Sequence, residues 1–210
     1  MTQSLSNIIN LEQYLLPSKA FRTKCKSTLD EYGALVLQKF LKPSAIQSIK
    51  DEGIDKKRCA YFTVNNHNIY LKPFDPKYSP NHPRNREVVS SKGCITTDQI
   101  PEGSALHILY GSSEFREFLC AVLDVEGLYE YADPLSSINL HYASKGQELG
   151  WHFDNSSFAI TLMIQTPEHG GTFEYVKDVR NADSGDMNYA LSEKVLNGEN
   201  PTETLSMGAG

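Results

Sequence analysis

The sequence predicts a mainly β protein with flanking helices, of the α+β class, whose strands form an antiparallel sandwich or barrel. Four short apolar or aromatic segments follow one another in the second half, at residues 135–142, 148–154, 159–165 and 172–176. Turn-forming residues separate these segments, at 145–146, 155–156 and 168–171. Helical spacing of apolar residues is found mainly in the first 60 residues. We therefore expect residues 1–60 to form a preamble of helices and a strand that packs on a core of residues 61–210.

The bulk properties are those of an ordinary globular domain. The 210 residues are enough to bury a core, and 40% are hydrophobic while 22% are charged. A formal net charge of −6, without a basic stripe, argues against nucleic acid as a partner. Four cysteines without a C-x-x-C pair indicate reduced thiols, and no apolar run approaches the length of a membrane span. We expect a cytoplasmic protein with no membrane partner, and a homodimer stays open.

The first 60 residues predict three helices and one strand. Apolar residues at helical spacing cover residues 7–16 until Pro17 stops the run, and a second helix covers residues 20–32 and ends at Gly33. Residues 34–41 are short and aliphatic, which favours a strand. Residues 43–53 carry Pro43 at a helix start and Gly53 just past the expected helix end.

From residue 61 onward the pattern changes from helical to extended. Residues 61–71 alternate enough to form a strand, whereas residues 72–86 hold four prolines and no apolar periodicity. So long a loop in a compact domain is functional or disordered. An amphipathic helix is expected at residues 112–123, capped by Ser112 or Ser113, and another helix at residues 186–197. Residues 198–210 resemble a turn between strands.

The side chains that point to chemistry are His152 and Asp154. In an extended segment, residues two apart lie on the same side, which brings an imidazole nitrogen beside a carboxylate oxygen. A chain of this composition holds about 0.7 His-x-acid pairs by chance, so the spacing alone decides nothing. The context adds weight, because Gly150-Trp151 precedes the pair and a β-like run follows it. Two histidines and one carboxylate with open positions are typical of non-haem Fe(II) oxygenases, and the alternative is a surface histidine beside an unrelated aspartate.

Three stretches of the sequence carry a resemblance to a known family. Gly150-Trp151-His152-Phe153-Asp154, the following segment 158–165 and the segment 170–176, which reads Gly-Gly-Thr-Phe-Glu-Tyr-Val, resemble the iron(II)/2-oxoglutarate-dependent oxygenases. The likeness is particularly to the bacterial branch that hydroxylates or halogenates free or N-acylated amino acids. A weaker likeness at residues 82–84, 98–101 and 109–110 extends it over most of the chain from about residue 61.

The resemblance implies a double-stranded β-helix (jelly-roll) core that uses Fe(II), 2-oxoglutarate as cosubstrate and dioxygen. In that family a second histidine on a late strand completes the ligand set, and an arginine after it grips the far carboxylate of 2-oxoglutarate. This sequence carries neither of them, so we expect the core to be C-terminally incomplete. Relatives that halogenate have Gly or Ala in place of Asp154, so the resemblance implies a hydroxylase.

The resemblance also implies roles for residues around the metal pair. Asn139, and less directly Tyr142, would donate a hydrogen bond to the near carboxylate of 2-oxoglutarate. Asn155 would face the substrate, or else only form a turn. Independently, a guanidinium matches a carboxylate with two parallel hydrogen bonds, so Arg84 or Arg86 could clamp a substrate carboxylate, the alternative being surface ion pairs. The remaining histidines are expected to be ordinary; they are His67, His82, His107, His141 and His169.

Together these inferences predict a dioxygenase that hydroxylates an unactivated C–H bond of a small polar substrate, a free or acylated amino acid. A second reading is a catalytically silent fragment, or a β-sandwich binding module, that keeps the shape of the oxygenases. A metal cupin would need two His-rich motifs at glycine-rich spacing, and the sequence lacks them.

Overall fold

The structure, a computed structural model, describes residues 4–133, 135–181 and 184–210. Its helices are α1 (Leu5–Ile8), α2 (Lys19–Tyr32), α3 (Pro43–Lys56), α4 (Ala105–Tyr110), α5 (Ser113–Leu123) and α6 (Tyr189–Leu196), with short 3-10 turns η1 (Lys57–Cys59) and η2 (Thr97–Gln99). The strands are β1 (Tyr61–Asn68), β2 (Glu87–Ile95), β3 (Leu140–Tyr142), β4 (Phe173–Tyr175) and β5 (Glu203–Leu205). Within this described part, every helix is too short or too polar to cross a membrane.

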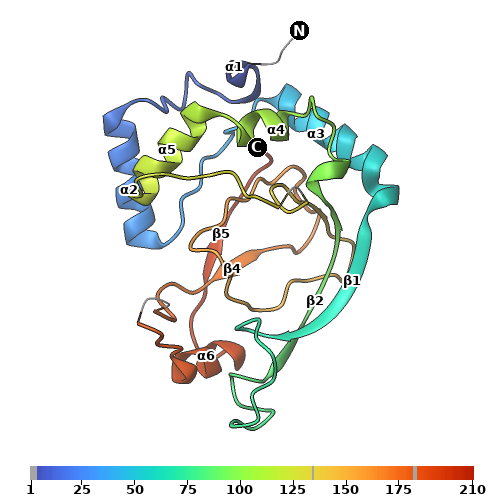
Figure 1. The fold of residues 1–210 in the computed structure, drawn as a ribbon, viewed down its shortest axis with the longest axis vertical. Coiled ribbons are helices and arrows are strands. Elements are labelled where there is room, and N and C mark those ends of the chain that lie inside the picture. The colour runs from blue at the N-terminus through green and yellow to red at the C-terminus, as the bar shows by residue number, and fades with distance from the viewer. Residues whose placement is uncertain (1–3, 134, 182–183) are drawn as a thin grey trace.

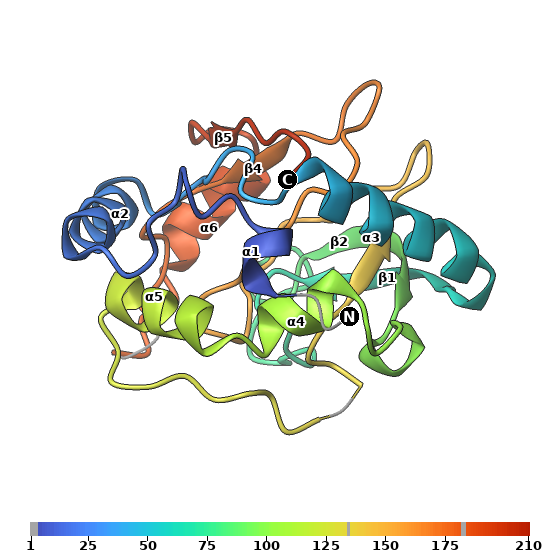
Figure 2. The same cartoon turned by 90° about the horizontal axis from the view of Figure 1, so that it is seen from above.

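The helices and strands divide the molecule into two ends. The first five helices gather at one end, and β1 and β2 run from there along one side toward the opposite end, where α6 lies (Figure 1). Seen from above, α1 sits over the middle of the helical end, with α2 and α3 on opposite sides of it (Figure 2). The strands form a sheet in the order β1-β2-β3 and a two-stranded sheet of β4 and β5, all antiparallel.

The main apolar core lies at the helical end and joins both predicted regions of the chain. Its buried side chains come from residues 8–49 and from the stretch between β2 and the end of α5, with Ile8, Leu16, Ile49, Ile95 and Phe118 all at most 2% exposed. Outside this cluster, Ile69, Tyr70 and Val179 are also buried, as is Val195 within α6, and Tyr70 packs on α6 through Tyr189 and Ser192. Burial of this apolar surface is the main force that holds the preamble on the strands.

Three of the predicted helices are confirmed by their caps. In α2, the Ser18 hydroxyl accepts the amide of Phe21, and Gly33 follows the helix with a left-handed φ of 72°. Pro43 occupies the first turn of α3, where its missing N–H costs nothing. The Ser112 hydroxyl caps α5. Gly53 was expected just past α3, but the helix continues to Lys56 because Gly53 is buried within it beneath Leu140 of β3.

The predictions for residues 7–16 and 34–41 were wrong in their secondary structure. Residues 7–16 form a helix only as far as Ile8, and residues 34–41 form no strand. Instead, Ile9 and Leu41 make a single antiparallel bridge, and the Lys42 amide donates to the Ile8 carbonyl at 2.7 Å. Pairing the two segments buries Ile8, Ile9 and Leu41 to 1% exposure or less. Tertiary burial therefore overrides local periodicity here.

The strand β1 is confirmed, but its partner β2 was not predicted. The two strands pair in continuous register from Tyr61 with Cys94 to Asn68 with Glu87. The sequence of β2, Glu-Val-Val-Ser-Ser-Lys-Gly-Cys-Ile, lacks a clear alternation of apolar and polar residues. Serine, glycine and lysine have low strand propensity, so only the long pairing with β1 reveals the strand.

Of the four predicted consecutive strands, the structure forms β3 and β4 and leaves the other two segments irregular. Residues 148–154 run beside β2, where the Ser91 amide donates to the Glu148 carbonyl at 2.7 Å. Serine side chains then replace the backbone ladder, because the Glu148 and Gly150 amides donate to the hydroxyls of Ser91 and Ser90. Residues 159–165 have no strand partner among the described residues. The jelly-roll core stays a prediction.

Candidate functional site

The side chains of His152 and Asp154 lie together, as the sequence predicted. Nε2 of His152 is 3.5 Å from Oδ1 of Asp154, and the two side chains are 32% and 53% exposed. The segment that carries them is not a regular strand, yet the two groups lie on the same side of it. An imidazole and a carboxylate thus share one solvent-accessible position.

One hydrogen bond orients the His152 ring. Its Nδ1 lies 2.8 Å from the carbonyl oxygen of Gly150. A carbonyl only accepts, so Nδ1 carries a proton and donates it to this oxygen. Metal-binding histidines almost always donate their second N–H in this way, which orients the ring. The other ring nitrogen, Nε2, then faces Oδ1 of Asp154.

The segment after His152 is anchored on both the backbone and the side-chain level. The Phe153 amide donates to the Ile69 carbonyl at 2.8 Å, just beyond β1. The Phe153 ring stacks on Tyr70 with centroids 5.2 Å apart. Arg180 holds the far side, because its Nη2 donates to the Asp154 carbonyl at 2.9 Å and its guanidinium lies 4.5 Å above the Phe153 ring. These contacts hold the two candidate ligands in place before any ligand binds.

Upstream of His152, Gly150 allows the segment to lie directly on β2. A Cβ atom at this position would lie 2.6 Å from the Val89 carbonyl oxygen and 2.8 Å from Cγ2 of Val88. Only glycine fits so close an approach between two backbones. This requirement explains the glycine that precedes the tryptophan in the sequence motif.

The donor pair fits part of a divalent metal site. Bonds of about 2.1 Å to adjacent corners of an octahedron place donor atoms about 3.0 Å apart, close to the distance between Nε2 and Oδ1. Among the described residues, no group of three His, Cys, Asp or Glu side chains comes together to complete a metal site. Two potential metal-binding side chains, those of His152 and Asp154, therefore come together here.

A cluster of aromatic side chains and two arginines adjoins the pair through Phe153. Tyr70 lies at its centre, in edge contact with Tyr189 at 5.6 Å between centroids, and its hydroxyl bonds Ser192 and the Met187 carbonyl. Burial raises the pKa of Tyr70, while the bond to Ser192 and the positive charges of Arg180 and Arg84 act in the opposite direction. Burial likewise raises the pKa of Tyr189, again opposed by Arg84. Both arginines thus lie close enough to the cluster to act on it electrostatically.

The structure separates the two arginines that the sequence proposed as carboxylate clamps. Arg86 donates to Oδ1 of Asn197 at 2.6 Å and to the Leu196 carbonyl at 3.1 Å, so it binds the C-terminal end of α6. Nη1 of Arg84 is buried and finds no hydrogen-bond partner among the described residues. A buried cationic nitrogen without an acceptor is costly, and a bound anion would satisfy it.

The proline-rich loop that carries Arg84 is ordered by a buried amide. Asn85 is 4% exposed, and its side chain bonds the amide and carbonyl of Asp75 and the carbonyls of Tyr78 and Ser79. The sequence predicted a loop held by its prolines. The Asn85 side chain also holds the loop, through its hydrogen bonds to the loop backbone. The loop lies at the same end of the molecule as α6 (Figure 1).

The remaining predicted site residues have other contacts. Asn139 is exposed, and its amide donates to the Ser136 carbonyl at 3.3 Å. The hydroxyl of Tyr142 donates to the Gly53 carbonyl in α3 at 2.6 Å. Asn155 is exposed in the bend after Asp154. Their roles toward 2-oxoglutarate and substrate stay predictions.

Four of the five histidines expected to be ordinary lie in local contacts of their own. His82 stacks on Tyr78, His107 bonds the Ile100 carbonyl, His141 lies 3.4 Å from Nζ of Lys92, and His169 is exposed at a turn. His67 differs, because its ring stands edge-on to that of His152 with centroids 6.0 Å apart.

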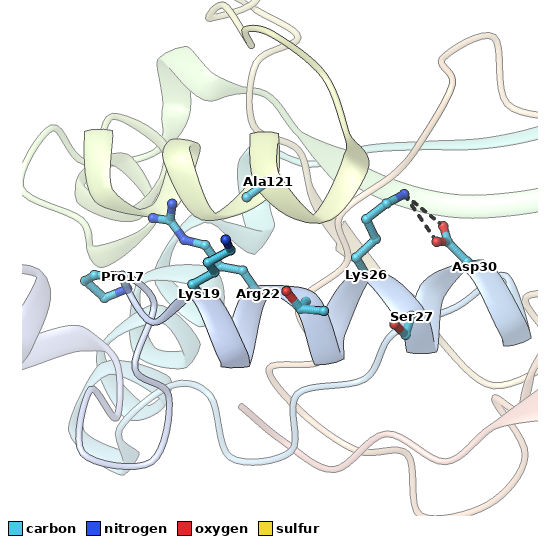
Figure 3. Close-up of a pocket in the computed structure, with 8 residues that line it drawn as sticks. Pro17, Lys19, Arg22, Lys26, Ser27, Asp30 and Ala121 are labelled. Carbon is cyan, nitrogen blue, oxygen red and sulfur yellow. Dashed lines mark hydrogen bonds and ion pairs between the residues drawn. The ribbon is translucent and has the colours of Figure 1, made fainter.

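A groove between α2 and α5 lies away from these residues. Two of the three cations that line it are paired with carboxylates. Lys26 lies 3.2 Å from Asp30 (Figure 3) and 3.5 Å from Asp124, and Arg22 lies 3.9 Å from Glu117, while Lys19 is the third. Exposed ion pairs of this kind contribute little. We place the candidate site at His152 and Asp154.

Comparison with protein-family models matches residues 17–206 to the family described as Halogenase D. The chain belongs to the Halogenase D family. Searches of curated proteins and of solved structures found no match. The Halogenase D match begins two residues before α2 and ends one residue past β5, so it includes most of the predicted preamble together with His152, Asp154, Arg84 and Arg180.

Some residues of this Halogenase D chain were missed by the sequence reasoning. Arg180 lies 26 positions after Asp154, and nothing in the spacing signals their contact. Ser90 and His67 reach the His152 segment only because β1 and β2 pair. Tyr70 ends a strand-like run that reads as core. All four depend on tertiary contacts, which a single sequence does not display.

Proposed function

We propose that this protein is an Fe(II)/2-oxoglutarate-dependent dioxygenase that hydroxylates an unactivated C–H bond of a small polar substrate, a free or acylated amino acid. The observation that carries the proposal is the shared position of Nε2 of His152 and Oδ1 of Asp154 in a chain of the Halogenase D family. The family's description points to an enzyme, and the donor pair suits a borderline divalent ion.

His152 and Asp154 would hold the ferrous ion. With 2-oxoglutarate and dioxygen, such a centre supplies the oxidant that removes a hydrogen atom from an unactivated C–H bond. The chain's own residues orient the ligands: the Gly150 carbonyl fixes the His152 ring, and Arg180 holds the backbone of Asp154. The exposure of both ligand side chains leaves room for a cosubstrate and a substrate to approach.

The carboxylate of Asp154 favours hydroxylation over halogenation. A carboxylate ligand occupies the coordination position that a halide would need, and halogenating relatives are expected to have Gly or Ala there. The product should therefore gain one oxygen atom rather than exchange hydrogen for chlorine, even in chloride buffer. The variant Asp154→Gly would lack this carboxylate and leave that coordination position open to a halide.

Arg84 supports a substrate that carries a carboxylate. Its buried Nη1 lacks a partner among the described residues, and a carboxylate satisfies a guanidinium with two parallel hydrogen bonds. Arg84 also acts electrostatically on Tyr189, whose ring packs edge-on against His82 and Tyr70, and ligand sites usually combine such apolar surface with a few polar groups. A free or N-acylated amino acid has this combination of groups.

One observation favours the second reading, a catalytically silent module that keeps the family's shape. Only two metal-binding side chains come together at this position among the described residues, and two ligands hold Fe(II) poorly. Such a module would still bind a carboxylate ligand at Arg84 but would not turn it over.

A turnover assay with a panel of candidate substrates tests the proposal. The protein is incubated with Fe(II), 2-oxoglutarate, oxygen and a panel of amino acids and N-acyl amino acids, and succinate and product masses are measured. The proposal predicts succinate release coupled to a substrate that gains one oxygen atom, with both lost in His152→Ala. Succinate release that is absent with every substrate, or unchanged in His152→Ala, would favour the silent module.

A further inference from the structure

A hydroxyl on β2 connects two strands to the segment that carries His152. Oγ of Ser90 lies 2.9 Å from the amide nitrogen of Gly150 and 2.7 Å from Nε2 of His67. His67 belongs to β1 and Ser90 to β2, so the contact joins three parts of the chain. Ser90 thus holds Gly150, which lies two residues before the candidate metal ligand His152.

The direction of each hydrogen bond in this group follows from chemistry. Nδ1 of His67 lies 3.1 Å from the Asn68 carbonyl, which can only accept, so Nδ1 carries the proton. In the neutral ring Nε2 of His67 then accepts, and Ser90 is its donor. The Gly150 N–H can only donate, and it donates to Oγ of the same serine. The serine hydroxyl therefore donates to His67 and accepts from Gly150.

Gly150 connects Ser90 to His152 through two hydrogen bonds. Its N–H is held by Ser90, and its carbonyl accepts the Nδ1 proton of His152 at 2.8 Å. The same glycine lies so close to Val88 and Val89 that no Cβ would fit. A residue that is held at its amide and packed against a strand presents its carbonyl in a fixed direction. The direction of that carbonyl sets where the Nδ1–H of His152 points, and with it the orientation of the ring.

We propose that Ser90 and His67 are positioning residues for His152, acting through Gly150 to hold its ring with the Nδ1–H on the Gly150 carbonyl and Nε2 turned toward Asp154. The part that concerns metal affinity rests on the proposed function, whereas the part that concerns the ring does not. The edge-on packing of the His67 ring against that of His152 adds a direct steric contact to the hydrogen-bonded path. Outer partners of metal ligands typically change metal affinity by about 10- to 100-fold when they are removed.

Variants of Ser90, Ser91 and His67 separate an effect on the orientation of His152 from an effect on the stability of the fold. Ser90→Ala removes the acceptor for the Gly150 amide, and Ser90→Thr restores a hydroxyl with a residue that suits strands. Ser91→Ala is the matched control, because Ser91 also accepts an amide of this segment, that of Glu148, at 3.2 Å. At His67, Gln keeps an acceptor near the place of Nε2, whereas Leu removes it.

The first measurement is made on the metal-free 210-residue protein. Two-dimensional ¹H–¹⁵N spectra of the imidazole nitrogens report the His152 ring form, and hydrogen exchange reports protection of the Gly150 amide. We expect the Nδ1–H form and a protected Gly150 amide in the parent, Ser90→Thr, His67→Gln and Ser91→Ala. Ser90→Ala and His67→Leu should shift His152 toward a mixture of forms and expose the Gly150 amide. An unchanged His152 ring form in Ser90→Ala, with the protein folded, would overturn the inference.

The second measurement is the affinity for Co(II), followed by its visible absorption. We expect Ser90→Ala to weaken Co(II) binding about tenfold, with Ser90→Thr and Ser91→Ala within about twofold of the parent. If the parent itself binds no Co(II) while the ring form responds to Ser90→Ala, the proposed function fails and the positioning role stands. If Co(II) binds but Ser91→Ala weakens it as much as Ser90→Ala does, the positioning role fails and the proposed function stands.

Discussion

Nε2 of His152 and Oδ1 of Asp154 face each other across 3.5 Å in a segment that forms no regular strand. The geometry that a strand was expected to supply comes instead from fixed points around the segment. These are the Gly150 amide at Ser90, the Phe153 amide at Ile69 and the Asp154 carbonyl at Arg180. The pair is thus held by the surrounding fold more than by its own secondary structure.

Removing either member of the pair should abolish metal binding and leave stability nearly unchanged. His152→Ala and Asp154→Ala each delete one of two ligands, so Co(II) affinity should fall by roughly 100-fold or more, beyond the loss seen for outer partners. The two side chains are partly exposed, and a surface pair contributes only about 0 to 1 kcal/mol. Isothermal titration with Co(II) and denaturant unfolding of each variant provide the check. Intact Co(II) binding in both variants would place the metal elsewhere.

Arg84 and Arg86 should respond in opposite ways to replacement by methionine. Arg84→Met removes a buried nitrogen that has no acceptor among the described residues, so unfolding free energy should stay level or rise while the KM for a carboxylate substrate rises roughly 10- to 100-fold. Arg86→Met loses two bonds to the end of α6 and should cost about 1 to 3 kcal/mol with KM unchanged. Denaturant titrations and initial rates report both quantities. A KM that responds to Arg86 but not to Arg84 would reverse the assignment.

Adding one methyl group at Gly150 should displace the candidate ligands. Gly150→Ala puts a Cβ 2.6 Å from the Val89 carbonyl oxygen, so the segment must move away from β2. We expect a loss of about 1 to 3 kcal/mol in unfolding free energy, together with weaker Co(II) binding. Gly103→Ala is the control, because a Cβ there meets no atom within 4 Å, and its effect should stay within about 0.5 kcal/mol. Equal effects of the two variants would contradict the close packing.

The Tyr70 hydroxyl should make the protein sensitive to alkaline pH. Burial raises its pKa above the value of 10.0 that it has when unfolded, so the unfolded chain loses this proton first as pH rises. The stability that depends on the neutral hydroxyl is complete below pH 10 and is lost as pH rises through the folded pKa. Tyr70→Phe should cost about 1 to 3 kcal/mol near neutral pH, since Ser192 and Met187 lose a partner. The difference between parent and variant should shrink above pH 10, and unfolding curves on both sides of that pH measure it.

What the sequence predicted best depends on local chemistry. The caps at Ser18 and Ser112 and the proline at position 43 define helix ends within a few residues, and the structure confirms all three helices. The pairing of His152 with Asp154 could be predicted for a similar reason, because residues two apart lie on the same side of an extended segment. Such features survive even where the predicted strand is absent.

What the sequence could not predict depends on contacts between distant segments. β2 has little apolar alternation, and its strand conformation follows from eight residue pairs with β1. Residues 7–16 have helical spacing, but Ile9 is buried by a bridge to Leu41, which only the folded chain brings near. The roles of Ser90 and Arg180 likewise appear only when β2 and the segment after β4 lie beside His152 and Asp154.

The most direct test is optical. Fe(II) and 2-oxoglutarate are added to the protein without oxygen, and the visible spectrum is recorded for the parent and for His152→Ala, with Ser91→Ala as a folded control. The account predicts a weak metal-to-ligand charge-transfer band in the parent and in Ser91→Ala, and no band in His152→Ala. A parent without the band, or a band that persists in His152→Ala, would contradict a ferrous site at His152 and Asp154.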